Sequence, residues 1–329
     1  MSAPDRTGRR LRRPPRPIGT DPGAPGVELE CREQLDGHHI EEVRRLVDAA
    51  TAADGVFPLS EHVLLHLRYG GDSAARHLLA RRDGELIGYG HLDISDAVTG
   101  ACGELAVAAG ARRTGVGTAL VSNMLALSPD GRLRLWAHGQ QPAASALARR
   151  FSFARERVLW RMHRSLLIPL PQPSLPDGVR TRAFRPGQDE AAWTALNNAA
   201  FAGHPDQGNW GPGQITLRER EPWFDPAGFV LAERQLAEPE LLGFVWTKVH
   251  GAGDHGHDPI GEIYVLGVAP SGQGLGLGRA LTLLGLHLLA ARGLREAMLY
   301  VDESNTPAIT LYSSLGFSRR NADVTFARG

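Results

Sequence analysis

Two stretches of the 329-residue chain predict the same local structure: residues 105–120, LAVAAGARRTGVGTAL, and residues 266–281, LGVAPSGQGLGLGRAL. Each predicts a short apolar strand, a glycine-rich turn and the start of an amphipathic helix. A glycine turn at a helix start leaves backbone N–H groups unpaired and directs the positive end of the helix outward, so the turn suits an anion. Neither stretch has the Lys-Ser/Thr pair of a P-loop or a strict G-x-G-x-x-G, so neither of these nucleotide motifs is predicted.

The spacing of both turns, Gln/Arg-x-x-Gly-x-Gly, resembles the pyrophosphate loop of the GCN5-related N-acetyltransferases (GNATs). That family binds acetyl-CoA at this loop. Because the motif occurs twice, each time after a strand, the resemblance implies two tandem GNAT domains. The fold class is then α/β (α+β), with a mixed central sheet flanked by helices in each domain.

The repeat and the composition along the chain predict four segments. Residues 1–26 form a disordered Arg/Pro-rich tail, and residues 168–178 form a stiff Pro-rich linker. The N-terminal GNAT domain covers residues 27–167, and the C-terminal, catalytic GNAT domain covers residues 179–329. The tail has arginines but no interleaved aromatic residues, so a solvated tail is favoured over a nucleic-acid-binding arm.

The bulk composition excludes several classes of protein. A hydrophobic content of 42% suffices for folded cores, and a formal net charge of zero gives no reason to expect a nucleic-acid or membrane partner. The two cysteines, Cys31 and Cys102, are far apart and indicate neither a disulfide framework nor a zinc site. The longest apolar stretch, residues 281–291, is too short to span a bilayer, and no signal peptide is visible. We therefore expect a cytoplasmic protein without a nucleic-acid or membrane partner, and we take it to be a monomer.

Acetyl transfer to an amine requires a base for the ammonium, polarisation of the thioester carbonyl and an acid for the leaving thiolate. Glu262 lies in the predicted strand 262–266, on the face that strand alternation also gives to Tyr264 and Leu266, and is the candidate base. Tyr312 occupies the place where the GNAT resemblance implies a thiol-protonating tyrosine. The backbone N–H groups of 266–268 are expected to polarise the carbonyl.

The first half has neither of these side chains. Aligning the two loops puts Ala101 opposite Glu262, and aligning the closing phrases 151–153 and 315–317 puts Ala148 opposite Tyr312. We therefore expect the first half to fold, and to keep an anion loop, but to be catalytically silent.

Phrases outside the loops, at residues 197–208, 223–226 and 246–250, resemble the mycothiol synthase family more narrowly. The resemblance implies acetyl-CoA as co-substrate, no metal, and the cysteinyl amine of cysteinyl-glucosaminyl-inositol as acceptor. It implies Glu262 as general base and Tyr312 as general acid. The acceptor-binding residues that it implies are Glu61, Asp206, Lys248, Glu262 and Tyr300.

The resemblance also implies two sets of cofactor-binding residues. The active set is Leu266, Gly267, Val268, Gln273, Gly274, Leu275, Gly276, Leu277, Gly278, Arg279, Asn305, Thr306, Pro307, Ala308, Ile309 and Thr310. The silent set is Leu105, Ala106, Val107, Arg113, Thr114, Gly115, Val116, Gly117 and Thr118.

Alternatives stay open at this point. The chain could be a tandem GNAT that acetylates another small-molecule amine or a protein N-terminus, or a non-catalytic acetyl-CoA sensor. The sensor predicts two empty catalytic positions, whereas the second half has both filled. Clustered His and Asp residues between His250 and Asp258 could ligate a metal, but the glycine-interrupted run favours a flexible loop.

Overall fold

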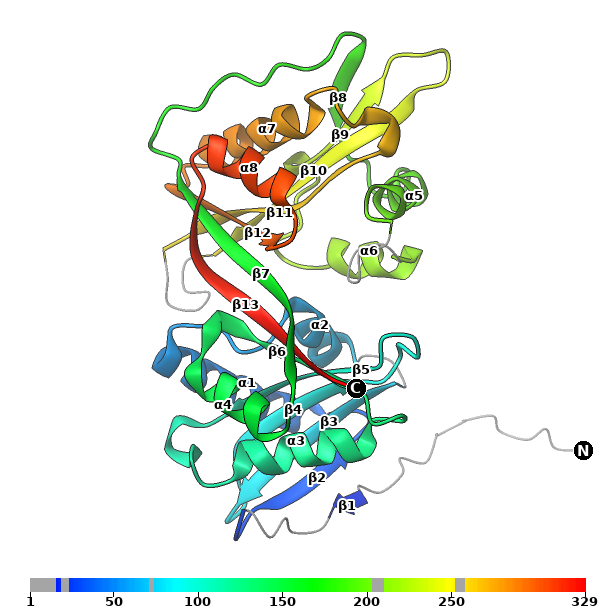
Figure 1. The fold of residues 1–329 in the computed structure, drawn as a ribbon. Coiled ribbons are helices and arrows are strands. Elements are labelled where there is room, and N and C mark those ends of the chain that lie inside the picture. Colours follow the sequence, from blue (N-terminus) through cyan, green and yellow to red (C-terminus); the bar gives the residue numbers. More distant parts are fainter. Residues whose placement is uncertain (1–15, 19–23, 71–73, 203–209, 252–257) are drawn as a thin grey trace, which may run out of the picture. The chain divides into compact units, whose positions relative to one another are not determined.

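The computed structural model describes residues 16–18, 24–70, 74–202, 210–251 and 258–329, and Figure 1 shows their secondary structure. Contacts divide the chain into two compact units. The first runs to Arg155 and also contains Thr325–Gly329, and the second is Glu156–Val324. Among the described residues, no helix combines the length and the apolar character needed to span a membrane.

The first unit has a sheet with helices on both faces. Its strands follow the order β1-β2-β3-β4-β5-β6, antiparallel except for the parallel pair β5 and β6. Helices α1 and α2 cover one face of the sheet, and α3 and α4 cover the other. The elements are β1 (Arg16–Ile18), β2 (Glu28–Arg32), α1 (Gly37–Asp54), α2 (Glu61–Tyr69), β3 (Ala75–Arg82), β4 (Glu85–Asp93), β5 (Ala101–Val107), α3 (Val116–Leu127), β6 (Leu133–Ala137) and α4 (Pro142–Arg150).

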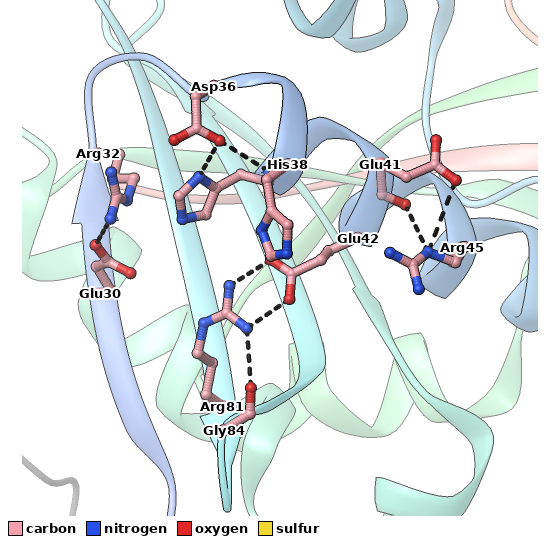
Figure 2. Close-up of polar contacts among 10 residues, drawn as sticks. Glu30, Arg32, Asp36, His38, Glu41, Glu42, Arg45, Arg81 and Gly84 are labelled. Carbon is pink, nitrogen blue, oxygen red and sulfur yellow. Dashed lines mark hydrogen bonds and ion pairs between the residues drawn. The ribbon is translucent and has the colours of Figure 1, made fainter.

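Local sequence explains how α1 is placed. The Asp36 side chain accepts a hydrogen bond from the backbone N–H of His39 at 3.0 Å, which caps the start of the helix. Gly55 ends the helix with a φ of 67°, a conformation that glycine adopts without strain. The Arg81 guanidinium donates to both Glu42 carboxylate oxygens, at 2.8 and 2.6 Å, and so ties α1 to β3 (Figure 2).

The second unit repeats this plan. Its strand order is β13-β7-β12-β11-β10-β9-β8, and β11 and β12 form a parallel pair. Helices α7 and α8 pack on one face, and α5 and α6 pack on the other. The elements are β7 (Ala154–Ser165), β8 (Val179–Ala183), α5 (Glu190–Ala200), α6 (Pro212–Glu219), β9 (Phe229–Arg234), β10 (Glu240–His250), β11 (Ile260–Val268), α7 (Leu277–Ala291), β12 (Glu296–Asp302), α8 (Thr306–Ser314) and β13 (Ser318–Arg328).

The structure departs from two of the predicted segments. Residues 16–18 of the predicted disordered tail pair with β2, and Ala24 is fully buried. Pairing at a sheet edge uses backbone groups and does not need the apolar side chains that the tail lacks. The predicted linker 168–178 lies within the second unit, where Leu170 and Leu175 pack against the apolar core under α7. The boundary between the compact units falls at Arg155 rather than near residue 167.

Candidate active site

The two glycine turns have the same backbone conformation. Gly276 and Gly115 are the N-cap residues of α7 and α3, with φ angles of 78° and 90°. Two residues earlier, Gly274 and Arg113 also have positive φ angles, 77° and 63°. The helical hydrogen bonds begin with the N–H of Ala280 and its counterpart in α3, so the preceding N–H groups lie at the open end of each helix. Each unit therefore presents a helix N-terminus that suits an anion.

Helix α8 packs beside the start of α7. A Cβ placed on Gly278 would lie 3.7 Å from the Leu311 side chain, and Arg279 Nη1 donates to Ser314 Oγ at 3.1 Å. Asn305 caps α8, because its side-chain oxygen accepts from the Ala308 N–H at 3.1 Å. The structure thus brings the loop 273–279 and the helix that begins with 305–310 together in one unit.

Glu262 is a buried carboxylate on β11, with 6% of the residue exposed. Its ladder partner on β10 is Lys248, and its Oε2 lies 2.7 Å from His250 Nε2. On the other side its ladder partner on β12 is Met298, two residues before Tyr300. The pKa of Tyr300 is raised by burial of part of its side chain and by the negative charges of Asp323 and Glu262. These side chains form a polar group around one carboxylate.

A β-bulge in β11 corrects the predicted alternation. Trp246 pairs with Val265, but the next residue, Thr247, pairs with Ile263, so Tyr264 is an extra residue. Tyr264 packs on the α5/α6 face, whereas Leu266 packs against the core under α7. The prediction that Glu262, Tyr264 and Leu266 share one face was therefore wrong for Leu266, because the alternation assumed an unbroken strand.

Lys248 lies against aromatic rings that the sequence did not assign to the site. Its Nζ is 4.4 Å from the ring centre of Trp223 and 5.3 Å from that of Tyr264. The Tyr264 hydroxyl accepts from Arg218 Nε at 2.6 Å. Cation–π contact restricts the ammonium to a position beside Glu262. The phrase 223–226 contains Trp223, but the sequence does not show that its ring contacts Lys248 and Tyr264. These residues come together only in the folded chain.

Tyr312 is buried in the α7/α8 core, with its ring centre 5.9 Å from that of Phe317 in an edge-to-face contact. Burial raises the pKa of Tyr312 to about 12. The phenol is therefore protonated at neutral pH, as a group that donates a proton has to be.

The first unit confirms the alignment of Ala148 with Tyr312. The N–H of Phe153 donates to the Ala148 carbonyl at 2.9 Å, and the N–H of Phe317 donates to the Tyr312 carbonyl at 3.0 Å. The two residues thus occupy the same position after equivalent helices.

In the first unit, Cys102 occupies the position that corresponds to Glu262. The sequence alignment that put Ala101 opposite Glu262 was therefore wrong. The strand pairings on both sides give this result. The extra residue Tyr264 explains why the sequence alignment of the two loops differs from the strand pairing by one residue. The ladder partners are Asp93 and Arg134 for Cys102, and Lys248 and Met298 for Glu262. Glu104 lies at the position of Val265, and its carboxylate accepts from the Ser60 N–H at 2.5 Å.

Two other predicted acceptor contacts do not belong to the described part of the second unit. Glu61 is the half-buried first residue of α2 in the first unit. Asp206 lies outside the described residues, as does much of the loop considered for a metal. Over the described ranges, no group of three or more His, Cys, Asp or Glu side chains is arranged to hold a metal ion.

Comparisons with known proteins identify the family of the chain. A sequence model described as the acetyltransferase (GNAT) family matches residues 43–153 and 192–317, one match in each compact unit. The chain is 53% identical to the mycothiol acetyltransferase of Acidothermus cellulolyticus, over 92% of this chain and 95% of that protein. It is 54% identical to that of Thermobispora bispora, over 92% of this chain and 99% of that protein.

Solved structures show the same fold at lower identity. A tandem GNAT protein from the clavulanic acid biosynthesis pathway matches with a TM-score of 0.69 at 19% identity, over 92% of this chain and 98% of that one. A GCN5-related N-acetyltransferase from Sphaerobacter thermophilus matches with a TM-score of 0.66 at 24% identity, over 91% of this chain and 95% of that one.

Proposed function

Because the chain belongs to the acetyltransferase (GNAT) family and, within it, to the mycothiol acetyltransferases, we propose that it transfers acetyl from acetyl-CoA to the cysteinyl amine of cysteinyl-glucosaminyl-inositol. Membership confirms the predicted tandem GNAT domains and the prediction of an N-acetyltransferase. The observation that carries the assignment of chemistry is the buried Glu262 carboxylate on the strand that leads into the anion loop.

The residues at the start of α7 fit a pyrophosphate. Gly276 has a left-handed backbone, and a Cβ built there meets no atom within 4 Å, so a ligand can approach the backbone closely. Leu266–Val268 lie beyond the parallel ladder with β12, which covers Gly261–Ile263. This placement supports a role for their backbone in polarising a carbonyl. When bound, acetyl-CoA supplies the thioester that the amine attacks.

The polar side chains take complementary roles in this proposal. Glu262 accepts a proton from the acceptor ammonium, and the buried Tyr312 phenol donates one to the departing thiolate. Lys248 and Tyr300 offer hydrogen-bond donors beside Glu262, which suits the hydroxyl groups of a sugar-inositol. Glu61 and Asp206 are proposed as further acceptor contacts on the resemblance alone.

The first unit is proposed to be silent. It keeps the backbone of the anion loop but has Cys102 and Ala148 where the base and the acid stand in the second unit. A non-catalytic sensor is disfavoured, since the second unit has both groups.

The acceptor is tested by steady-state kinetics with acetyl-CoA. The panel is cysteinyl-glucosaminyl-inositol, the same sugar-inositol without cysteine, an aminoglycoside and a peptide with a free N-terminus. We expect kcat/KM to be highest for the cysteinyl compound by a wide margin. Equal or faster acetylation of an unrelated amine would overturn the acceptor while leaving the acetyltransferase assignment in place.

A further inference from the structure

His250 makes a direct contact with the proposed base. It is the last residue of β10, and its Nε2 lies 2.7 Å from Glu262 Oε2. An ionised carboxylate can only accept hydrogen bonds, so in this contact Nε2 carries the hydrogen. The distance is that of a charge-assisted hydrogen bond.

The contact is diagonal across the two strands. The ladder partner of His250 is Ile260, two residues before Glu262 on the same face of β11. The Glu262 side chain is 8% exposed and the His250 side chain 23% exposed, so the imidazole is the more accessible of the two.

Among the described residues, the other charged and titratable groups near Glu262 make no hydrogen bond to its carboxylate. The Lys248 ammonium is held over the rings of Trp223 and Tyr264. On β12, the pKa of Tyr300 is raised by burial and by the negative charges of Asp323 and Glu262, and Arg161 lowers it. In the described part of the chain, the hydrogen bond to the Glu262 carboxylate comes from His250.

We propose that His250 is a positioning residue for the reaction: its Nε2–H binds Oε2 of Glu262 and leaves Oε1 to take the proton from the acceptor ammonium. The inference rests on the proposed role of Glu262 as base. In the step, an N–H bond of the acceptor ammonium breaks and an Oε1–H bond forms, which leaves the neutral amine, while the Nε2–H···Oε2 hydrogen bond persists. The imidazole thereby fixes the plane of the carboxylate.

The test compares His250→Ala with His250→Gln, whose amide N–H reaches about as far as Nε2. We expect His250→Ala to lower kcat about 10- to 100-fold, the effect of one hydrogen bond to a charged group, with an unchanged KM for acetyl-CoA. His250→Gln should restore most of kcat. His287→Ala is the matched control, because His287 lies on α7 and contacts the Pro171 carbonyl instead.

Several outcomes would overturn the proposal. These are wild-type kinetics in His250→Ala, a rise in the KM for acetyl-CoA in place of a fall in kcat, or no rescue by Gln in a folded variant. A second measurement does not need turnover: ¹⁵N NMR of the wild-type imidazole should show the hydrogen on Nε2, and an unprotonated Nε2 would contradict the contact. If wild type acetylates no cysteinyl acceptor, the proposed function fails, and the NMR result still decides the contact.

Discussion

Replacing Glu262 by Gln should lower kcat by about 100- to 10,000-fold, the usual contribution of a general base. That loss corresponds to about 3–5 kcal/mol of transition-state stabilisation. The fold should survive, because Gln has the volume of Glu and its amide oxygen can accept the His250 Nε2–H that now reaches Oε2 at 2.7 Å. The KM for acetyl-CoA should stay nearly constant, since the anion loop is unchanged.

The assay is initial-rate formation of the acetylated acceptor, followed by chromatography across a range of pH. Wild-type kcat/KM should fall at low pH, and this dependence should weaken in Glu262→Gln. Glu104→Gln is the matched control, because Glu104 is also a buried strand carboxylate that accepts a backbone hydrogen bond. A loss below about tenfold in Glu262→Gln, or an equal loss in Glu104→Gln, would refute the assignment of the base.

Three further results are expected. Tyr312→Phe should lower kcat about 100-fold with little change in melting temperature, since the ring packs in an apolar core and only the hydroxyl is lost. Burial lowers the pKa of His77 to about 4 and of His91 to about 3, so the folded state resists protonation that the unfolded chain accepts below about pH 6.5. Stability of the first unit should therefore fall as pH drops from about 6.5, by on the order of 2 kcal/mol per histidine at about pH 5, in denaturant titrations. Glu61→Ala should raise the acceptor KM about 10- to 100-fold and leave the KM for acetyl-CoA unchanged.

For each of these three predictions, one result would contradict it. Wild-type turnover in Tyr312→Phe would remove the proposed acid. An acid dependence of stability that persists unchanged in a folded His77→Gln, His91→Gln double variant would assign it to other groups. Acceptor kinetics of Glu61→Ala equal to wild type would remove the first unit from acceptor binding.

The parts of the fold that follow from local chemistry were predictable. Glycine turns, helix caps and apolar periodicity are set within a few residues, so the two loops lie where the sequence placed them. Gly316, with a φ of 87°, follows α8 as expected for a helix C-terminus.

The parts that depend on strand register were not predictable. Tyr264 is an extra residue in β11 and shifts the strand register by one. As a result, the residue of the first unit that corresponds to Glu262 is Cys102 and not Ala101. The His250 contact depends on the same register, which no local pattern specifies. Pairing of residues 16–18 uses backbone groups that composition does not report.

The central claim is that only the second unit performs the chemistry, and a pair of matched variants tests it most directly. Gly276→Asp and Gly115→Asp each place a carboxylate at a helix N-cap with a positive φ, so the backbone strain is alike in the two variants. Measured by kcat/KM for acetyl-CoA, Gly276→Asp should abolish activity by repelling the pyrophosphate, whereas Gly115→Asp should retain most of it. Equal loss in both folded variants would contradict the division into a catalytic and a silent unit.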